Sequence, residues 1–67
     1  MNIAMIARRV LAEFEEMPGM SLTRRQAMRL FGLDDHIARI VLDVLVDSAY
    51  LHETTSGKLT LGERVAA

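Results

Sequence analysis

Apolar residues recur at spacings of three and four along the first part of the chain. They are Ile3, Ile6, Ala7, Val10, Phe14 and Met17, with Leu11 beside them. Such spacing places the side chains on one face of an α-helix. Pro18 and Gly19 follow, and proline cannot continue the hydrogen bonds of a helix. The pattern therefore predicts an amphipathic helix over residues 2–16.

A second helix is predicted over residues 24–31 from the residues at its two ends. Thr23 and Gln26 have the spacing of a capping box, in which each side chain accepts a hydrogen bond from the other residue's backbone N–H. Gly32 suits the left-handed conformation that commonly ends a helix.

A third helix is predicted over residues 35–48, because Asp34 is a good N-cap and an apolar-rich segment follows it. Only residues 31–34 connect the second and third helices. A tight connection that contains glycine between two short amphipathic helices is typical of a helix-turn-helix.

The remaining chain predicts a two-stranded β-hairpin over residues 50–61. Residues 50–54 and 59–61 have strand-forming side chains, and a polar, glycine-containing turn separates them. Residues 63–67 are expected to form a helical stub or a frayed end. The fold class is thus mainly α with a small β-hairpin (α+β), in a single domain over residues 1–67.

A chain of 67 residues that is 51% apolar is expected to fold, but a domain this small is marginally stable. Small domains commonly add disulfides, a metal or a partner subunit. Cysteine is absent, which excludes disulfides and thiolate metal sites, and two histidines make a poor ligand set. We therefore expect no metal and no other cofactor, and a homodimer becomes the leading source of additional stability.

The distribution of charged and apolar residues also limits the class of protein. No apolar run approaches the length of a membrane span, and Arg8 and Arg9 interrupt the N-terminal stretch where a secretory signal would be. We expect a cytoplasmic protein.

The net charge is -1, so the basic character usual for nucleic-acid-binding proteins is missing. Residues 1–33 carry five basic and three acidic side chains and residues 34–67 three and six, so any DNA-binding surface must be local.

Catalytic signals are absent from the sequence. The serines have no recognisable histidine and carboxylate partners. Residues 55–58 end in Gly-Lys but lack the leading glycine and the following helix of a phosphate-binding loop. We expect no enzymatic activity and no small-molecule ligand.

Three segments resemble the winged helix-turn-helix superfamily of DNA-binding domains. Residues 21–33 (SLTRRQAMRLFGL) are similar to its second helix and turn, and residues 34–45 (DDHIARIVLDVL) are similar to its recognition helix. Residues 47–51 (DSAYL) are similar to the entry into the wing, although Ala49 stands where glycine is usual, which would strain or lengthen the end of the helix.

This resemblance implies a transcription-regulator-like protein that binds double-stranded DNA. The third helix would enter the major groove, the second would cross the backbone and the wing would touch flanking phosphates. A homodimer would present two recognition helices to two half-sites. The implied DNA-binding residues are Arg24, Arg25 and Arg29 on phosphates, His36 and Arg39 on base edges, and Lys58 in the wing.

Several of these residues have an equally simple structural explanation. The three arginines of the second helix are either a phosphate-binding patch or a solvated helix face. Arg39 has the geometry to read a guanine edge or to pair with Asp35 or Asp43, four residues away, and we favour the ion pair. His36 has the plain alternative of a surface histidine without a role.

A second function is suggested by the third helix, which is apolar around most of its circumference. Ile40 and Val44 lie one turn apart and are predicted to point outward, away from the core. Four aspartates belong to the same segment. Exposed apolar groups in a patch usually mark a partner surface. The alternative to DNA binding is therefore a protein–protein interaction module that uses this apolar and acidic surface.

Overall fold

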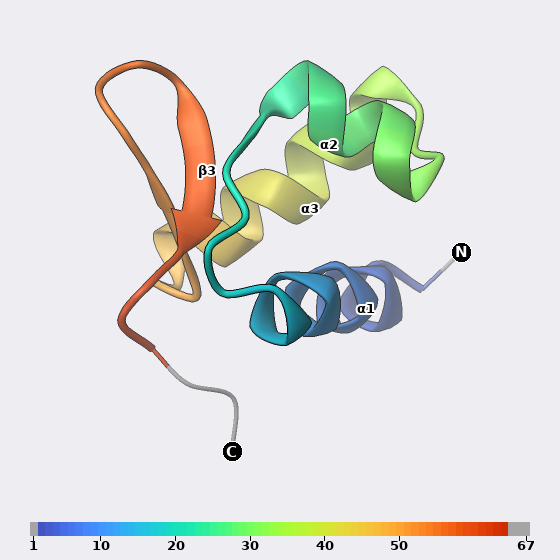
Figure 1. Ribbon diagram of the computed structural model, residues 1–67. Helices are drawn as coiled ribbons and strands as arrows, with labels where there is room; N and C mark the ends of the chain where they lie inside the picture. The colour runs from blue at the N-terminus through green and yellow to red at the C-terminus, as the bar shows by residue number, and fades with distance from the viewer. Residues whose placement is uncertain (1, 65–67) are drawn as a thin grey trace.

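The computed structural model describes residues 2–64 and contains three helices and a small antiparallel sheet (Figure 1). The elements follow the order α1 (Ile3–Glu16), β1 (Leu22–Thr23), α2 (Arg24–Phe31), α3 (Asp35–Asp47), β2 (Leu51–Glu53) and β3 (Lys58–Leu61). The predicted class, mainly α with a small β component, is confirmed, and all three helices lie within a residue of their predicted ends. Residues 63 and 64 are not helical, and the rest of the predicted stub lies outside the described residues.

The sheet has three strands, so the prediction of a two-stranded hairpin is incomplete. The hairpin of β2 and β3 is present, and β1 pairs with the other side of β3, which gives the strand order β1-β3-β2. Leu22 lies opposite Leu59, and Thr23 lies opposite Lys58. Thr23 has the extended backbone of an N-cap residue (φ -70°, ψ 163°), and it can therefore pair with β3 immediately before α2 begins.

The helix ends are fixed by the capping residues that the sequence predicts. The Thr23 hydroxyl accepts a hydrogen bond from the Gln26 backbone N–H (3.1 Å), and the Gln26 side chain accepts one from the Thr23 backbone N–H (2.9 Å). Asp34 caps α3 by accepting from the Ile37 N–H (2.8 Å). Gly32 ends α2 in the left-handed conformation (φ 67°). The helix-turn-helix segment is therefore defined by local interactions.

The end of α3 has the same backbone geometry as the end of α2, but without a glycine. Ala49 adopts a left-handed conformation (φ 64°), and the backbone N–H groups of Ala49 and Tyr50 donate to the carbonyls of Val46 and Leu45. These two bonds form a Schellman motif, in which glycine is the favoured residue. The strain expected from alanine at this position is confirmed.

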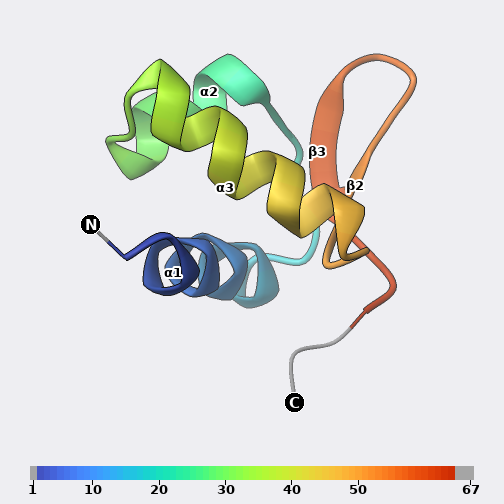
Figure 2. The same ribbon diagram turned by 180° about the vertical axis from the view of Figure 1, so that it is seen from behind.

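The core lies where α1, α3 and the sheet meet. Figures 1 and 2 show α3 between α2 on one side and α1 on the other. Phe14 is fully buried, and its ring centroid lies 6.2 Å from that of Phe31. The buried apolar residues are Ala7, Val10, Leu11, Phe14, Ala27, Ala38, Val41, Leu42, Leu45, Leu51 and Leu59. Within residues 2–64, no helix combines the length and the apolar character needed to span a membrane.

Candidate nucleic-acid interface

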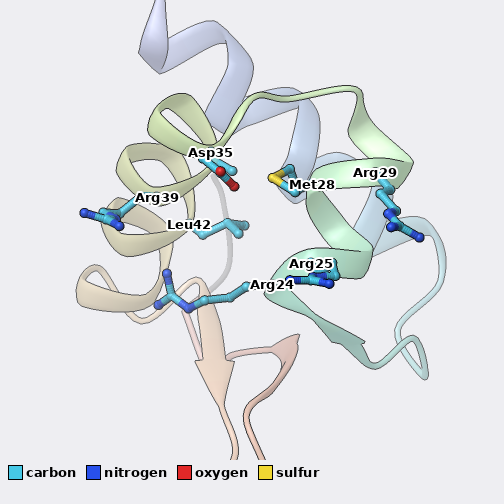
Figure 3. A pocket seen from close by; sticks show the side chains of 8 residues that line it. Arg24, Arg25, Met28, Arg29, Asp35, Arg39 and Leu42 are labelled. Carbon is cyan, nitrogen blue, oxygen red and sulfur yellow. The ribbon is translucent and has the colours of Figure 1, made fainter.

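An open groove of about 480 Å³ separates α2 from α3, and the four arginines that were predicted to bind DNA line it (Figure 3). Met28 and Leu42 point into the space between the two helices. Four arginines and one aspartate are the charged residues of the groove. The lining residues are Arg24, Arg25, Met28 and Arg29 from α2, with Asp35, Ala38, Arg39 and Leu42 from α3.

Helical spacing explains why these side chains share one groove. Arg25, Met28 and Arg29 are separated by three and four residues, so they share one side of α2. The lining residues of α3, from Asp35 to Leu42, follow the same spacing. Four of the residues predicted to contact phosphates or bases line the groove. Three of them are exposed to solvent, namely Arg25, Arg29 and Arg39.

The fourth arginine, Arg24, is engaged in ion pairs that join three elements. Its Nε and Nη2 donate to the two carboxylate oxygens of Glu53 on β2, at 2.9 and 3.1 Å. Its Nη1 lies 2.8 Å from Oδ1 of Asp43 on α3. A single guanidinium at the start of α2 therefore connects that helix to α3 and to the β2–β3 hairpin.

The charges of this cluster stabilise one another's ionised forms. Hydrogen bonding from Arg24 lowers the pKa of the Glu53 carboxyl, and the same bond raises the pKa of the Arg24 guanidinium. Because two carboxylates surround one guanidinium, the positive potential of the groove depends on Arg25, Arg29 and Arg39. The phosphate contact predicted for Arg24 stays a prediction, and the structure gives this side chain a bridging role as well.

The ion pair favoured for Arg39 is wrong. Asp43 pairs with Arg24, and among the residues that the structure describes no carboxylate lies within 4.0 Å of the Arg39 guanidinium. Figure 3 shows this side chain extending outward from α3, on the side away from α2. The guanidinium of Arg39 is therefore open to solvent.

The other predicted DNA-binding residues lie outside the groove. His36 is exposed in the first turn of α3, and Lys58 is exposed where β3 begins, at the end of the hairpin turn. The Lys58 backbone N–H donates to the Thr54 hydroxyl (3.1 Å), which orders the turn. The structure thus gathers four of the six predicted residues in one place and leaves these two apart.

The two apolar residues predicted to point outward from α3 differ in exposure. Val44 is 46% exposed, whereas Ile40 is half-buried but does not belong to the core cluster or its apolar surroundings. Elsewhere in the described residues, Met5, Met17 and Leu30 are the other exposed large apolar side chains.

Glu53 is a member of the site that sequence analysis missed, and Asp43 was considered only as a partner of Arg39. Arg24 and Glu53 are 29 residues apart in the chain, and no helical or strand spacing relates them. Their pairing follows from the tertiary fold, since β1 brings the start of α2 beside the hairpin. Met28 and Leu42 were likewise not recognised as groove residues, because apolar side chains that face the core have the same helical spacing in the sequence.

No family model, curated protein or solved structure matches this chain. In the described part of the chain, no group of three or more histidine or carboxylate side chains is placed to hold a metal ion. The geometry and charge of the groove are therefore what indicates a function for this chain.

Proposed function

We propose that this chain is a winged helix-turn-helix domain that binds double-stranded DNA as a cytoplasmic, transcription-regulator-like module. The observation that carries the proposal is that four arginines are among the residues that line the groove between α2 and α3. The order of the helices and the position of the hairpin beside α3 are compatible with this fold. In this arrangement α3 enters the major groove and α2 lies against the sugar–phosphate backbone.

The arginines of α2 and the arginine of α3 have different roles in the proposed binding, because they lie on different helices. Arg25 and Arg29 on α2 contact phosphates, which positions the domain without reading sequence. Arg39 extends from α3 and suits the O6 and N7 acceptors of guanine, with His36 as a second base contact. Lys58 supplies the phosphate contact of the hairpin, which acts as the wing.

The acidic residues of α3 and of its N-cap limit the affinity of this interface. Asp34, Asp35, Asp43 and Asp47 repel phosphates, and of these four only Asp43 has an ion-pair partner within residues 2–64. Few phosphate contacts and several nearby carboxylates predict weak non-specific binding, with Kd of about 10⁻⁴ M or weaker at physiological salt. Binding will accordingly be strongest at low salt.

An NMR titration of labelled protein with a mixed-sequence duplex, at low and moderate salt, tests the proposal. We expect shifts on α2, α3 and Lys58 that fade as the salt concentration rises. Arg25→Gln and Arg29→Gln should each weaken binding and reduce the slope of log K against log salt by about 1. Arg64→Gln is the matched control, because it removes the same charge from a residue that does not line the groove. The guanidinium carbon of Arg64 lies over the ring of Tyr50, 4.9 Å from its centroid. Equal effects of all three variants, or no shifts at low salt, would refute DNA binding through the groove.

The exposure of Val44 favours a second candidate function, a protein–protein interaction module that uses the apolar and acidic surface of α3. Val44 and Ile40 lie on a side of α3 other than the groove-lining one. Ile40→Asp and Val44→Asp should then abolish an assembly while leaving a folded monomer. Folded variants with unchanged assembly would exclude this function.

A further inference from the structure

The outer face of α1 exposes an ordered set of apolar and charged side chains. Figures 1 and 2 show α1 at the edge of the molecule, on the far side of α3 from α2. Met5 is 66% exposed, the largest value among the exposed large apolar side chains of the described residues. Eight residues of α1 are exposed; Ala4 and Glu13 lie at the margins of this face, and the residues along its middle are Met5, Arg8, Arg9, Ala12, Glu15 and Glu16.

The charges along α1 are separated in a way that contacts within the chain do not explain. Arg8 and Arg9 lie in the first half of the helix, and Glu15 and Glu16 lie in its last turn. Carboxylates in a last turn face the negative end of the helix dipole, which destabilises them. None of these four side chains makes an ion pair within residues 2–64. The arrangement is therefore unfavourable in an isolated domain.

The same residues form a regular pattern along the helix. Met5 and Ala12, Arg8 and Glu15, and Arg9 and Glu16 are each seven residues apart. Residues seven apart lie almost directly above one another on a helix. Met5 and Ala12 consequently form a central line, the pair Arg8 and Glu15 flanks it on one side, and the pair Arg9 and Glu16 flanks it on the other.

We propose that this face, which we call the α1 face, binds the α1 face of a second copy of the chain in an antiparallel homodimer. A two-fold axis through Ala12 places Arg8 opposite the partner's Glu15 and Arg9 opposite the partner's Glu16. Four ion pairs then form from charges that make no ion pair within residues 2–64 of the single chain. The small side chain of Ala12 lets the two helices approach closely at the axis, and Met5 lies just past the C-terminal end of the partner helix, which ends at Glu16.

The length of α1 limits the strength of this dimer. Its 14 residues extend about 21 Å, which is short for the interface of a permanent dimer. The association is therefore weak, dependent on concentration and sensitive to salt. The groove between α2 and α3 stays open in the dimer, because α1 lies on the other side of α3. The inference does not depend on DNA binding, and the two proposals fail separately.

Sedimentation velocity with paired charge variants tests the proposal. The variant Arg8→Glu/Arg9→Glu has only acidic charges on the α1 face, and Glu15→Arg/Glu16→Arg has only basic ones. We expect wild-type protein to shift from the mass of one chain toward that of two between about 10 μM and 1 mM. Each variant alone should stay monomeric over this range, and an equimolar mixture of the two should associate.

Three outcomes overturn the proposal: a monomeric wild type at the highest concentration, variants that each associate like wild type, or a mixture that does not associate. The substituted side chains are all exposed, so folding is expected to persist, and far-UV circular dichroism verifies it. The quadruple variant, which carries both changes on one chain and so exchanges the two halves of the charge pattern, should regain the wild-type association. It thereby separates loss of contact from loss of fold.

The direction of the helices is tested by cross-linking, for which the absence of native cysteine is an advantage. Ala12→Cys places two thiols beside the two-fold axis, where a disulfide forms on mild oxidation. Met5→Cys places them about 21 Å apart along the helices, too far for a disulfide. Cross-linking of both variants indicates parallel helices, and cross-linking of neither indicates a different interface; either result overturns the antiparallel dimer.

Discussion

Replacing Glu53 with glutamine tests whether the ion pairs of Arg24 with Glu53 and Asp43 hold the hairpin against the helices. Glu53→Gln removes the charge from an interaction with two hydrogen bonds, at 2.9 and 3.1 Å. The side chains of Arg24 and Glu53 are 38% and 32% exposed, so solvent screens the pair. We expect a loss of about 1 kcal/mol, near the upper end for exposed ion pairs, because the arginine contact is forked and a second carboxylate shares it.

Arg24→Gln should cost more, because it leaves the carboxylates of Glu53 and Asp43 without the cation between them. For a domain of this size, each kcal/mol lowers Tm by about 4–8 °C. The double variant Arg24→Gln/Glu53→Gln should cost less than the sum of the two single changes, by about 0.5–1 kcal/mol.

The contribution of Glu53 also depends on pH in a defined direction. Its carboxyl has a lowered pKa in the folded protein, because the ionised form accepts hydrogen bonds from Arg24. The stability gained is present in full above the ordinary glutamate pKa of about 4.3 and is lost as the pH falls through the lower, folded-state pKa. The free-energy difference between wild type and Glu53→Gln should therefore be largest near neutral pH and should diminish in acid.

Urea unfolding of dilute protein, followed by far-UV circular dichroism at about pH 7 and about pH 3, measures these differences. Glu63→Gln is the control, because Glu63 is exposed and makes none of the ion pairs found within residues 2–64. Effects of Arg24→Gln and Glu53→Gln that add within about 0.3 kcal/mol, or an equal loss in Glu63→Gln, would refute the bridging role of Arg24.

Two backbone substitutions make further predictions that thermal unfolding can check. Ala49→Gly should stabilise the protein by about 0.5–1 kcal/mol, because glycine adopts the left-handed conformation without strain. An unchanged or lower Tm would contradict this explanation. Gly62→Ala should destabilise it by about 1–3 kcal/mol, because a Cβ at this position collides with the backbone of Ala49, Tyr50 and Leu51; a neutral effect would show that the strand end moves freely.

The helices could be predicted from the sequence because their signals are local. The capping box of Thr23 and Gln26 and the N-cap of Asp34 connect residues three apart, so the sequence alone is sufficient to place them. The strand β1 could not be predicted. It has two residues, too few for alternation to be visible, and it forms because β3 lies beside the start of α2.

The candidate site was predictable in its residue types but not in its pairing. The rule that residues four apart on a helix interact favoured a partner for Arg39 in its own helix. The structure instead pairs Asp43 with Arg24, which is 19 residues away along the chain and in another helix. A local rule fails here because the tertiary contact offers Asp43 a guanidinium already held in place by Glu53.

This pairing changes how the role of Arg24 in DNA binding must be tested. Charge reversal at Arg24 would place three acidic groups together and release the hairpin from the helices, so weaker DNA binding by that variant would not demonstrate a phosphate contact. Arg25 and Arg29 make no ion pair within residues 2–64, and their substitution changes the charge of the groove without breaking the bridge. Arg24 also offsets the charge of Asp43, a carboxylate that would otherwise repel phosphates beside α3. Arg24 thus supports a positive groove through Asp43 and Glu53, whether or not it touches DNA.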